Sequence, residues 1–91
     1  MIELSGNIKL INFDSIEPAL LIVVKKVVGN YTRKISEAYN DFKSIEVSIE
    51  DAELNKIRVR VEVSETIIEK EAHDENLFFA LDKALAAVLK Q

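Results

Sequence analysis

The strongest constraint on the fold of this chain is a run of apolar residues at helical spacing between Ser15 and Phe42. Apolar side chains recur there at steps of three and four, which places them on one side of a helix. They are Ile16, Leu20, Val23, Val24, Val27, Val28, Tyr31, Ile35, Ala38, Tyr39 and Phe42. Such a helix would be roughly 40 Å long at about 1.5 Å per residue, enough to cross a small domain. We therefore expect one long helix whose apolar side packs against a sheet.

Local signals indicate where this helix begins and whether it is continuous. Asp14 or Ser15 can cap its first turn, and Pro18 suits a position near the start because its missing N–H costs nothing there. Gly29-Asn30 could instead end one helix and begin another, since glycine followed by a polar residue is a common helix stop. The apolar pattern keeps its phase across this pair, so we expect a continuous helix.

The apolar spacing changes from helical to alternating after Lys43. Apolar and polar residues alternate over 45–50 and again over 57–64, which is typical of half-buried antiparallel strands joined by a polar loop. A further strand is expected over 67–73, followed by a last helix over 74–91 with Asp74 as its cap. The expected buried stripe of that helix is Leu77, Phe78, Leu81, Ala84, Leu85 and Val88.

The first residues indicate a short strand at the start of the chain. Ile2 and Leu4 alternate with polar residues and are followed by Gly6-Asn7, a turn signal. Residues 8–13 form a second extended piece, whose register the pattern does not fix. The expected order is thus strand, long helix, three strands and helix. This order predicts a single α+β domain over residues 1–91, a two-layer β-α-β-β-β-α fold with a four-stranded mixed sheet and two helices packed on one face.

Composition limits the classes of function. The chain has a formal net charge of −4, which argues against indiscriminate nucleic-acid binding because such affinity comes mainly from neutralised phosphates. The charge is unevenly placed: residues 1–43 hold six basic and five acidic groups, a net +1, and residues 44–91 hold six and eleven, a net −5. Without cysteine there is no disulfide framework or thiolate chemistry. We see no signal peptide and no apolar run long enough for a membrane span, so the cytoplasm is the expected compartment.

Two signatures resemble the family that includes hibernation-promoting factor and ribosome-associated inhibitor. The first is an aliphatic-x-aliphatic strand followed by Ser or Thr and Gly, here residues 2–6, Ile-Glu-Leu-Ser-Gly. The second is an Ala that ends the last strand, here Ala72, followed after three residues by Asn-Leu-Phe-Phe-Ala-Leu-Asp at 76–82. The segment 35–50, with its alternating aliphatic residues at 45–49, is also similar to the family. The resemblance covers nearly the whole chain.

The resemblance implies a translation modulator that occupies the decoding region of the small ribosomal subunit, excludes mRNA and tRNA, and inhibits translation. It implies the small subunit and its rRNA as partners, with no cofactor, no metal and no small-molecule substrate. The residues expected to contact rRNA phosphates are Lys25, Lys26, Arg33, Lys34, Lys83 and Lys90.

The residues themselves single out the outer side of the long helix as the candidate site. No acidic residue lies between Glu17 and Glu37, whereas four basic residues do. On a helical wheel Ile22, Lys26, Gly29 and Arg33 share one stripe opposite the core, where glycine would let a phosphate backbone approach closely while the two cations neutralise it. The competing interpretation is an ordinary solvated helix face. Lys25 and Lys34 lie at the margins of the buried stripe and could lie along it.

Other features support other hypotheses. Phe79 shares an outward stripe of the last helix with Lys83 and Lys90, where it could stack on a base or rest at the edge of the core. Glu69 and Glu71 share a strand face with His73, a conceivable metal or acid-base trio that cross-strand ion pairs would explain equally well.

Two rival functions follow. The first is a protein-interaction or homodimerising module of the same fold that uses its open sheet face, where the charged residues are Arg58, Arg60, Glu62, Glu69 and Glu71. The second is an enzyme, with His73 as its base. The chain shows no accompanying nucleophile and no glycine-rich phosphate loop, so we do not predict an enzyme.

Overall fold

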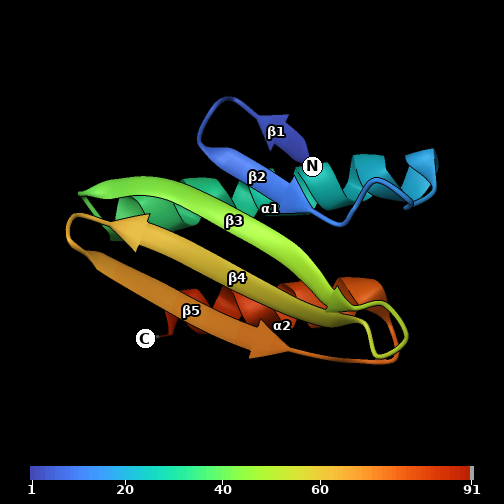
Figure 1. Ribbon diagram of the computed structural model, residues 1–91. Helices are drawn as coiled ribbons and strands as arrows, with labels where there is room; N and C mark the ends of the chain where they lie inside the picture. The colour runs from blue at the N-terminus through green and yellow to red at the C-terminus, as the bar shows by residue number, and fades with distance from the viewer. Residues whose placement is uncertain (91) are drawn as a thin grey trace.

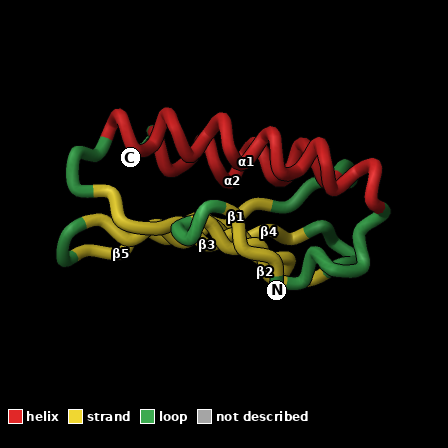
Figure 2. Tube along the Cα trace, turned by 90° about the horizontal axis from the view of Figure 1, so that it is seen from above, coloured by secondary structure: helices red, strands yellow, loops and turns green. Residues whose placement is uncertain are grey.

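Two helices lie side by side over one face of a five-stranded sheet (Figures 1 and 2). The computed structural model describes residues 1–90. The strands follow one another across the sheet in chain order, with β2 and β3 parallel and all other neighbours antiparallel. The elements are β1 Ile2–Leu4, β2 Ile8–Ile11, α1 Pro18–Ala38, β3 Phe42–Asp51, β4 Lys56–Val63, β5 Thr66–Ala72 and α2 Leu77–Leu89. The predicted α+β class and the two helices on one face are confirmed.

The prediction of four strands is wrong, because the N-terminal segment forms a hairpin rather than a single strand. Ser5 and Gly6 adopt positive φ angles of 52° and 74°, and this turn folds β1 back antiparallel to β2. It is therefore β2, not β1, that precedes the α1 crossover and pairs in parallel with β3. The aliphatic-x-aliphatic-Ser-Gly signature of residues 2–6 lies on the added edge strand and its turn.

A left-handed residue turns the chain from β2 toward α1. Asn12 has a φ of 68°, which asparagine tolerates better than most residues, and its side-chain amide donates a hydrogen bond to the Ile49 carbonyl, 3.0 Å away. This conformation interrupts the alternation of β2. Phe13 is therefore fully buried, although a continuous strand would place it on the face of Lys9 and Ile11.

The long helix is continuous through Gly29, as predicted, but shorter than its sequence pattern at both ends. It begins after Glu17, which makes no side-chain capping bond, and the Asp14 carboxylate instead accepts the N-terminal ammonium at 3.0 Å. The expected cap at Asp14 or Ser15 is therefore wrong. At the other end Tyr39 is extended and Phe42 already belongs to β3. No helix within residues 1–90 is long and apolar enough to cross a bilayer.

The N-cap of the last helix lies two residues beyond the predicted one. The Asn76 side chain accepts hydrogen bonds from the backbone N–H groups of Phe78 and Phe79, which is the usual role of an N-cap residue. Asp74, the predicted cap, accepts the backbone N–H of Asn76 instead. The predicted last residue of this helix, Gln91, lies outside the described residues.

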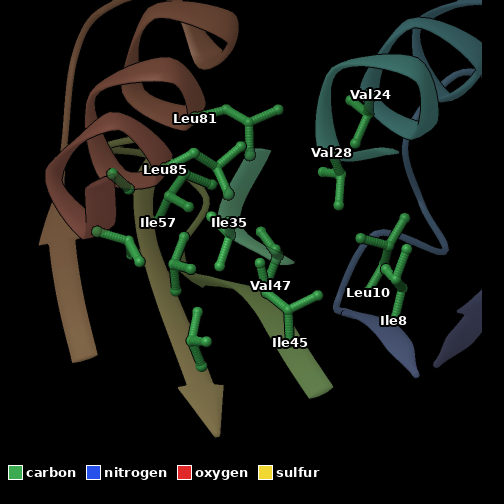
Figure 3. Packing of buried hydrophobic residues seen from close by; sticks show 14 of the residues in the cluster. Ile8, Leu10, Val24, Val28, Ile35, Ile45, Val47, Ile57, Leu81 and Leu85 are labelled. Carbon is green, nitrogen blue, oxygen red and sulfur yellow. The ribbon is translucent and has the colours of Figure 1, made fainter. Parts of the chain in front are cut away.

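The core lies between the helix pair and the sheet (Figure 3). One apolar stripe of each helix faces the inward side chains of β2, β3 and β4, so that burial of both layers stabilises the fold together. The labelled members are Val24, Val28 and Ile35 of α1, Leu81 and Leu85 of α2, and Ile8, Leu10, Ile45, Val47 and Ile57 of the sheet. The opposite helix surfaces are left free for contacts outside the fold.

Candidate nucleic-acid interface

The four predicted cations of α1 are all exposed on the helix. Lys26 and Arg33 are seven residues apart, which puts them on one line of the outer surface, about 10 Å from each other along the axis. Across residues 1–90, none of Lys25, Lys26, Arg33 and Lys34 forms an ion pair. Their charges are therefore available to an anionic partner.

Gly29 lies in the middle of this cationic surface, and the fold does not require a glycine there. Its φ is not positive, and a Cβ added to it would have no atom within 4 Å. Lys25, Lys26 and Arg33 are its neighbours at four residues before, three before and four after, so bare backbone is flanked by three cations. Because glycine weakens a helix interior by roughly 0.5–1 kcal/mol relative to alanine, its presence favours a contact outside the fold.

We expect Gly29→Ala to stabilise the protein by about 0.5–1 kcal/mol, since alanine favours the helix and the added methyl group meets no neighbour. Urea unfolding measures this change. If the open backbone is where a phosphate backbone approaches, the same variant should bind RNA more weakly despite its higher stability. The exposed neighbour Asn30→Ala is the control, because it changes helix propensity without filling the space over Gly29. A destabilised Gly29→Ala variant would contradict this account of the helix.

Lys34 is exposed on α1 beside Tyr31, a residue that contacts α2. The Tyr31 hydroxyl donates a hydrogen bond to Asp82 Oδ1 of α2, 2.5 Å away, and this bond, helped by burial and by the carboxylate charge, raises the pKa of Tyr31 to about 12. Lys34 Nζ lies 5.3 Å from the centre of the Tyr31 ring, a cation–π distance. Lys34 therefore lies beside the residue that joins α1 to α2.

The two predicted cations of α2 lie in different surroundings. Lys83 Nζ forms an ion pair with Asp74 Oδ2 at 2.7 Å, and this bond lowers the pKa of the Asp74 carboxyl. Lys90 is exposed just after the last turn of α2. The structure thus gathers Lys25, Lys26 and Arg33 around Gly29, whereas Lys83 already has an acidic partner.

The structure adds a contact between the helices and the exposure of three apolar side chains to what the sequence indicated. The Tyr31–Asp82 hydrogen bond joins residues of two predicted helices, but only the packing of α1 beside α2 brings them together. Leu20 and Val23 were expected in the buried stripe, yet they are exposed. Phe79, whose position was left open, is also exposed, at 62%.

The open sheet face carries rows of alternating charge, and its arginines form ion pairs across the strands. One row crosses all five strands in the order Glu3, Lys9, Glu46, Arg60 and Glu69. Arg60 pairs with Glu69 at 3.8 Å, and Arg58 pairs with Glu50 at 2.7 Å and Glu71 at 3.6 Å.

These pairs give Glu69 and Glu71 the cross-strand partners that the sequence suggested as the alternative to a metal site. Among residues 1–90, no group of three or more acidic or histidine side chains is arranged to hold a metal ion.

The fold matches two solved structures along most of its length. The N-terminal domain of Protein Y from Thermus thermophilus superposes with a TM-score of 0.68 and 17% identity, covering 89% of this chain and 86% of that one. A ribosomal subunit interface protein from Coxiella burnetii superposes with a TM-score of 0.59 and 16% identity, covering 90% and 88%. No family model matches the sequence, and no curated protein sequence matches it.

These similarities define a class of fold, that of the N-terminal domain of Protein Y and of a ribosomal subunit interface protein. The resemblance to the hibernation-promoting factor family, inferred from the sequence motifs, is thereby confirmed for the fold.

Proposed function

We propose that this protein binds the small ribosomal subunit through rRNA and modulates translation. The observation that carries the proposal is the surface around Gly29. Three exposed cations without ion pairs in residues 1–90 surround bare helix backbone, in a fold shared with a ribosomal subunit interface protein. Cations spaced along a helix suit a phosphate backbone, whose contacts fix position without reading sequence.

The family resemblance extends the proposal to a binding site on the small subunit and to an effect on translation. In it, the protein occupies the decoding region in the cytoplasm and inhibits translation by excluding mRNA and tRNA. Lys25, Lys26 and Arg33 would hold rRNA phosphates, with Lys34 and Lys90 as outer contacts. Lys83 would take part only after leaving Asp74, since the two now pair at 2.7 Å. We propose no catalytic step, cofactor, metal or small-molecule substrate.

Sedimentation with purified small subunits tests the proposal. We expect the protein to pellet with the subunits at low salt and to be released as salt is raised, because phosphate contacts weaken steeply with salt. Prior loading of the subunits with mRNA and tRNA should reduce the bound fraction if the decoding region is the site. Failure to pellet at low salt would end the proposal.

The alternative function, a protein-interaction module that uses the open sheet face, draws less support from the geometry. The arginines of that face are paired with carboxylates within it. Edge-to-edge pairing of β5 with a second copy is also disfavoured, because full overlap of Thr66–Ala72 places Glu69 opposite its own copy. The open face therefore favours solvent over a partner.

A further inference from the structure

Within residues 1–90, β5 forms the long edge of the sheet. It runs over Thr66–Ala72 and pairs with β4 along its whole length without a bulge, whereas the opposite edge, β1, has three residues. Among the helices and strands, β5 contacts only β4 and α2. In an edge strand every second residue directs its N–H and C=O groups out of the sheet. The outer side of β5 is therefore a row of backbone donors and acceptors that a further strand could pair with.

The side chains of β5 give this edge a definite pattern of charge. Ile67, Glu69 and Glu71 are exposed and lie on the open sheet face. Lys70 alternates with them and lies on the helix side with the buried Ile68, where it is half-buried. The edge thus carries two carboxylates on one face and an ammonium group between them on the other.

The rows of charge that cross the open face end at β5 on a carboxylate. Glu46 of β3, Arg60 of β4 and Glu69 of β5 follow one another in register and alternate in sign. In the next such row Arg58 lies opposite Glu71 and forms an ion pair with it at 3.6 Å. Opposite charges across neighbouring strands stabilise a sheet, and like charges destabilise it. A strand added beside β5 would continue both rows if it carried cations there.

We propose that the outer edge of β5 binds an extended, basic segment of another protein as an added antiparallel strand. The backbone of the segment pairs with the edge, and its alternate side chains give specificity. Two lysine or arginine residues, separated by one position, lie opposite Glu69 and Glu71. An acidic residue between them lies opposite Lys70, and an aliphatic residue lies opposite Ile67, which is 47% exposed.

The chemistry of this edge favours a basic strand over RNA or a second copy. RNA would bring phosphates to Glu69 and Glu71, and it has no peptide groups with which the edge could pair. A second copy at full overlap would place Glu69 opposite its own copy. The cations of α1 stay free, because α2 contacts β4 and β5, whereas α1 contacts β3 (Figure 1). The added strand and RNA would therefore occupy different parts of the molecule.

Fluorescence anisotropy of a labelled peptide with the RNA-free protein tests this proposal separately from ribosome binding. The probe is Val-Lys-Glu-Lys-Val-Ile-Thr, whose antiparallel register sets its two lysines opposite Glu71 and Glu69 and its isoleucine opposite Ile67. We expect saturable binding and slower hydrogen exchange of the outward amides of β5. The peptide Val-Glu-Lys-Glu-Val-Ile-Thr, with the charges exchanged, should bind about tenfold more weakly or less, because like charges then face each other.

A charge reversal on β5 tests the position of the peptide. Glu69→Lys should weaken binding of the first peptide about tenfold, since a favourable pair becomes a repulsive one. Glu62→Lys is the matched control, because it makes the same charge change on β4, one strand in from the edge, and should bind as the wild type does. Circular dichroism confirms that both variants remain folded.

Four outcomes would overturn the proposal. They are no binding of the first peptide, equal binding of the two peptides, binding without slower exchange in β5, and equal losses in Glu69→Lys and Glu62→Lys. Slower exchange of the β5 amides with rising protein concentration alone would assign the edge to a second copy and overturn it as well.

Discussion

Replacing Lys26 and Arg33 together by glutamine is expected to weaken binding to the small ribosomal subunit by about tenfold for each side chain. A factor of ten corresponds to about 1.4 kcal/mol, near the lower end of the range for a hydrogen bond to a charged group. The two side chains lie on one line of α1, two turns apart, and neither forms an ion pair within residues 1–90, so no internal bond compensates for their loss. Co-sedimentation at several salt concentrations measures the change.

The salt dependence of binding adds a second measurement to the same experiment. Each phosphate contact contributes about 0.7–0.9 to the slope of the logarithm of affinity against the logarithm of salt concentration. Removal of two contacts should therefore lower the slope by about 1.5. If only the net charge of the protein mattered, removal of two cations from any other surface would lower the slope by the same amount.

Lys43→Gln/Lys56→Gln is the matched control, because it also removes two positive charges, but from the sheet and not from α1. Lys43 lies 3.9 Å from Glu62, and Lys56 lies 4.0 Å from Glu71, so both already have acidic partners. We expect this control to bind almost as the wild type does. Equal losses in the two double variants would mean that binding follows total charge, and the surface around Gly29 would lose its assigned role.

The sequence predicts those elements whose patterns are local and periodic. The alternating runs of β3 and β4 and the stripe of Val24, Val28 and Ile35 follow from spacing alone, because one buried face determines each. The turn at Gly6 and the extended piece after it were predicted, but their pairing as a hairpin was not, because such short alternating segments do not fix their register. Only Gly6 carries a sequence signal for such a turn, and Ser5 does not.

The sequence predicted correctly only those neighbours in the candidate site that belong to one helix. A helical wheel brings Lys26, Gly29 and Arg33 together, and the structure agrees because α1 is continuous. A helical wheel does not show that Lys83 pairs with Asp74, because Asp74 lies nine positions earlier and outside α2. Leu20 and Val23 belong to the apolar stripe by spacing, but their burial would depend on where α2 begins. Contacts between elements thus decide which predicted cations and apolar residues remain available.

Phe13→Ala is expected to destabilise the protein by about 3–5 kcal/mol, the range for deletion of a fully buried aromatic ring. Phe13 is 0% exposed because the left-handed Asn12 directs the chain into the core between β2 and α1. A loss of this size is a large fraction of the about 5–15 kcal/mol that stabilises an ordinary domain. Urea unfolding followed by circular dichroism should show a much lower midpoint.

Phe79→Ala is the control for this prediction, because it removes the same ring from a site that is 62% exposed. Its effect on stability should stay within about 0.5 kcal/mol, as for most surface substitutions. Because both variants remove the same side chain, the difference between their losses of stability reports the burial of Phe13. Two variants of similar stability would show that Phe13 does not lie in the core, and the reversal of alternation at Asn12 would then be wrong. A large loss confined to Phe13→Ala would show that the Phe13 ring lies in the core that α1, the helix carrying Lys26 and Arg33, packs against.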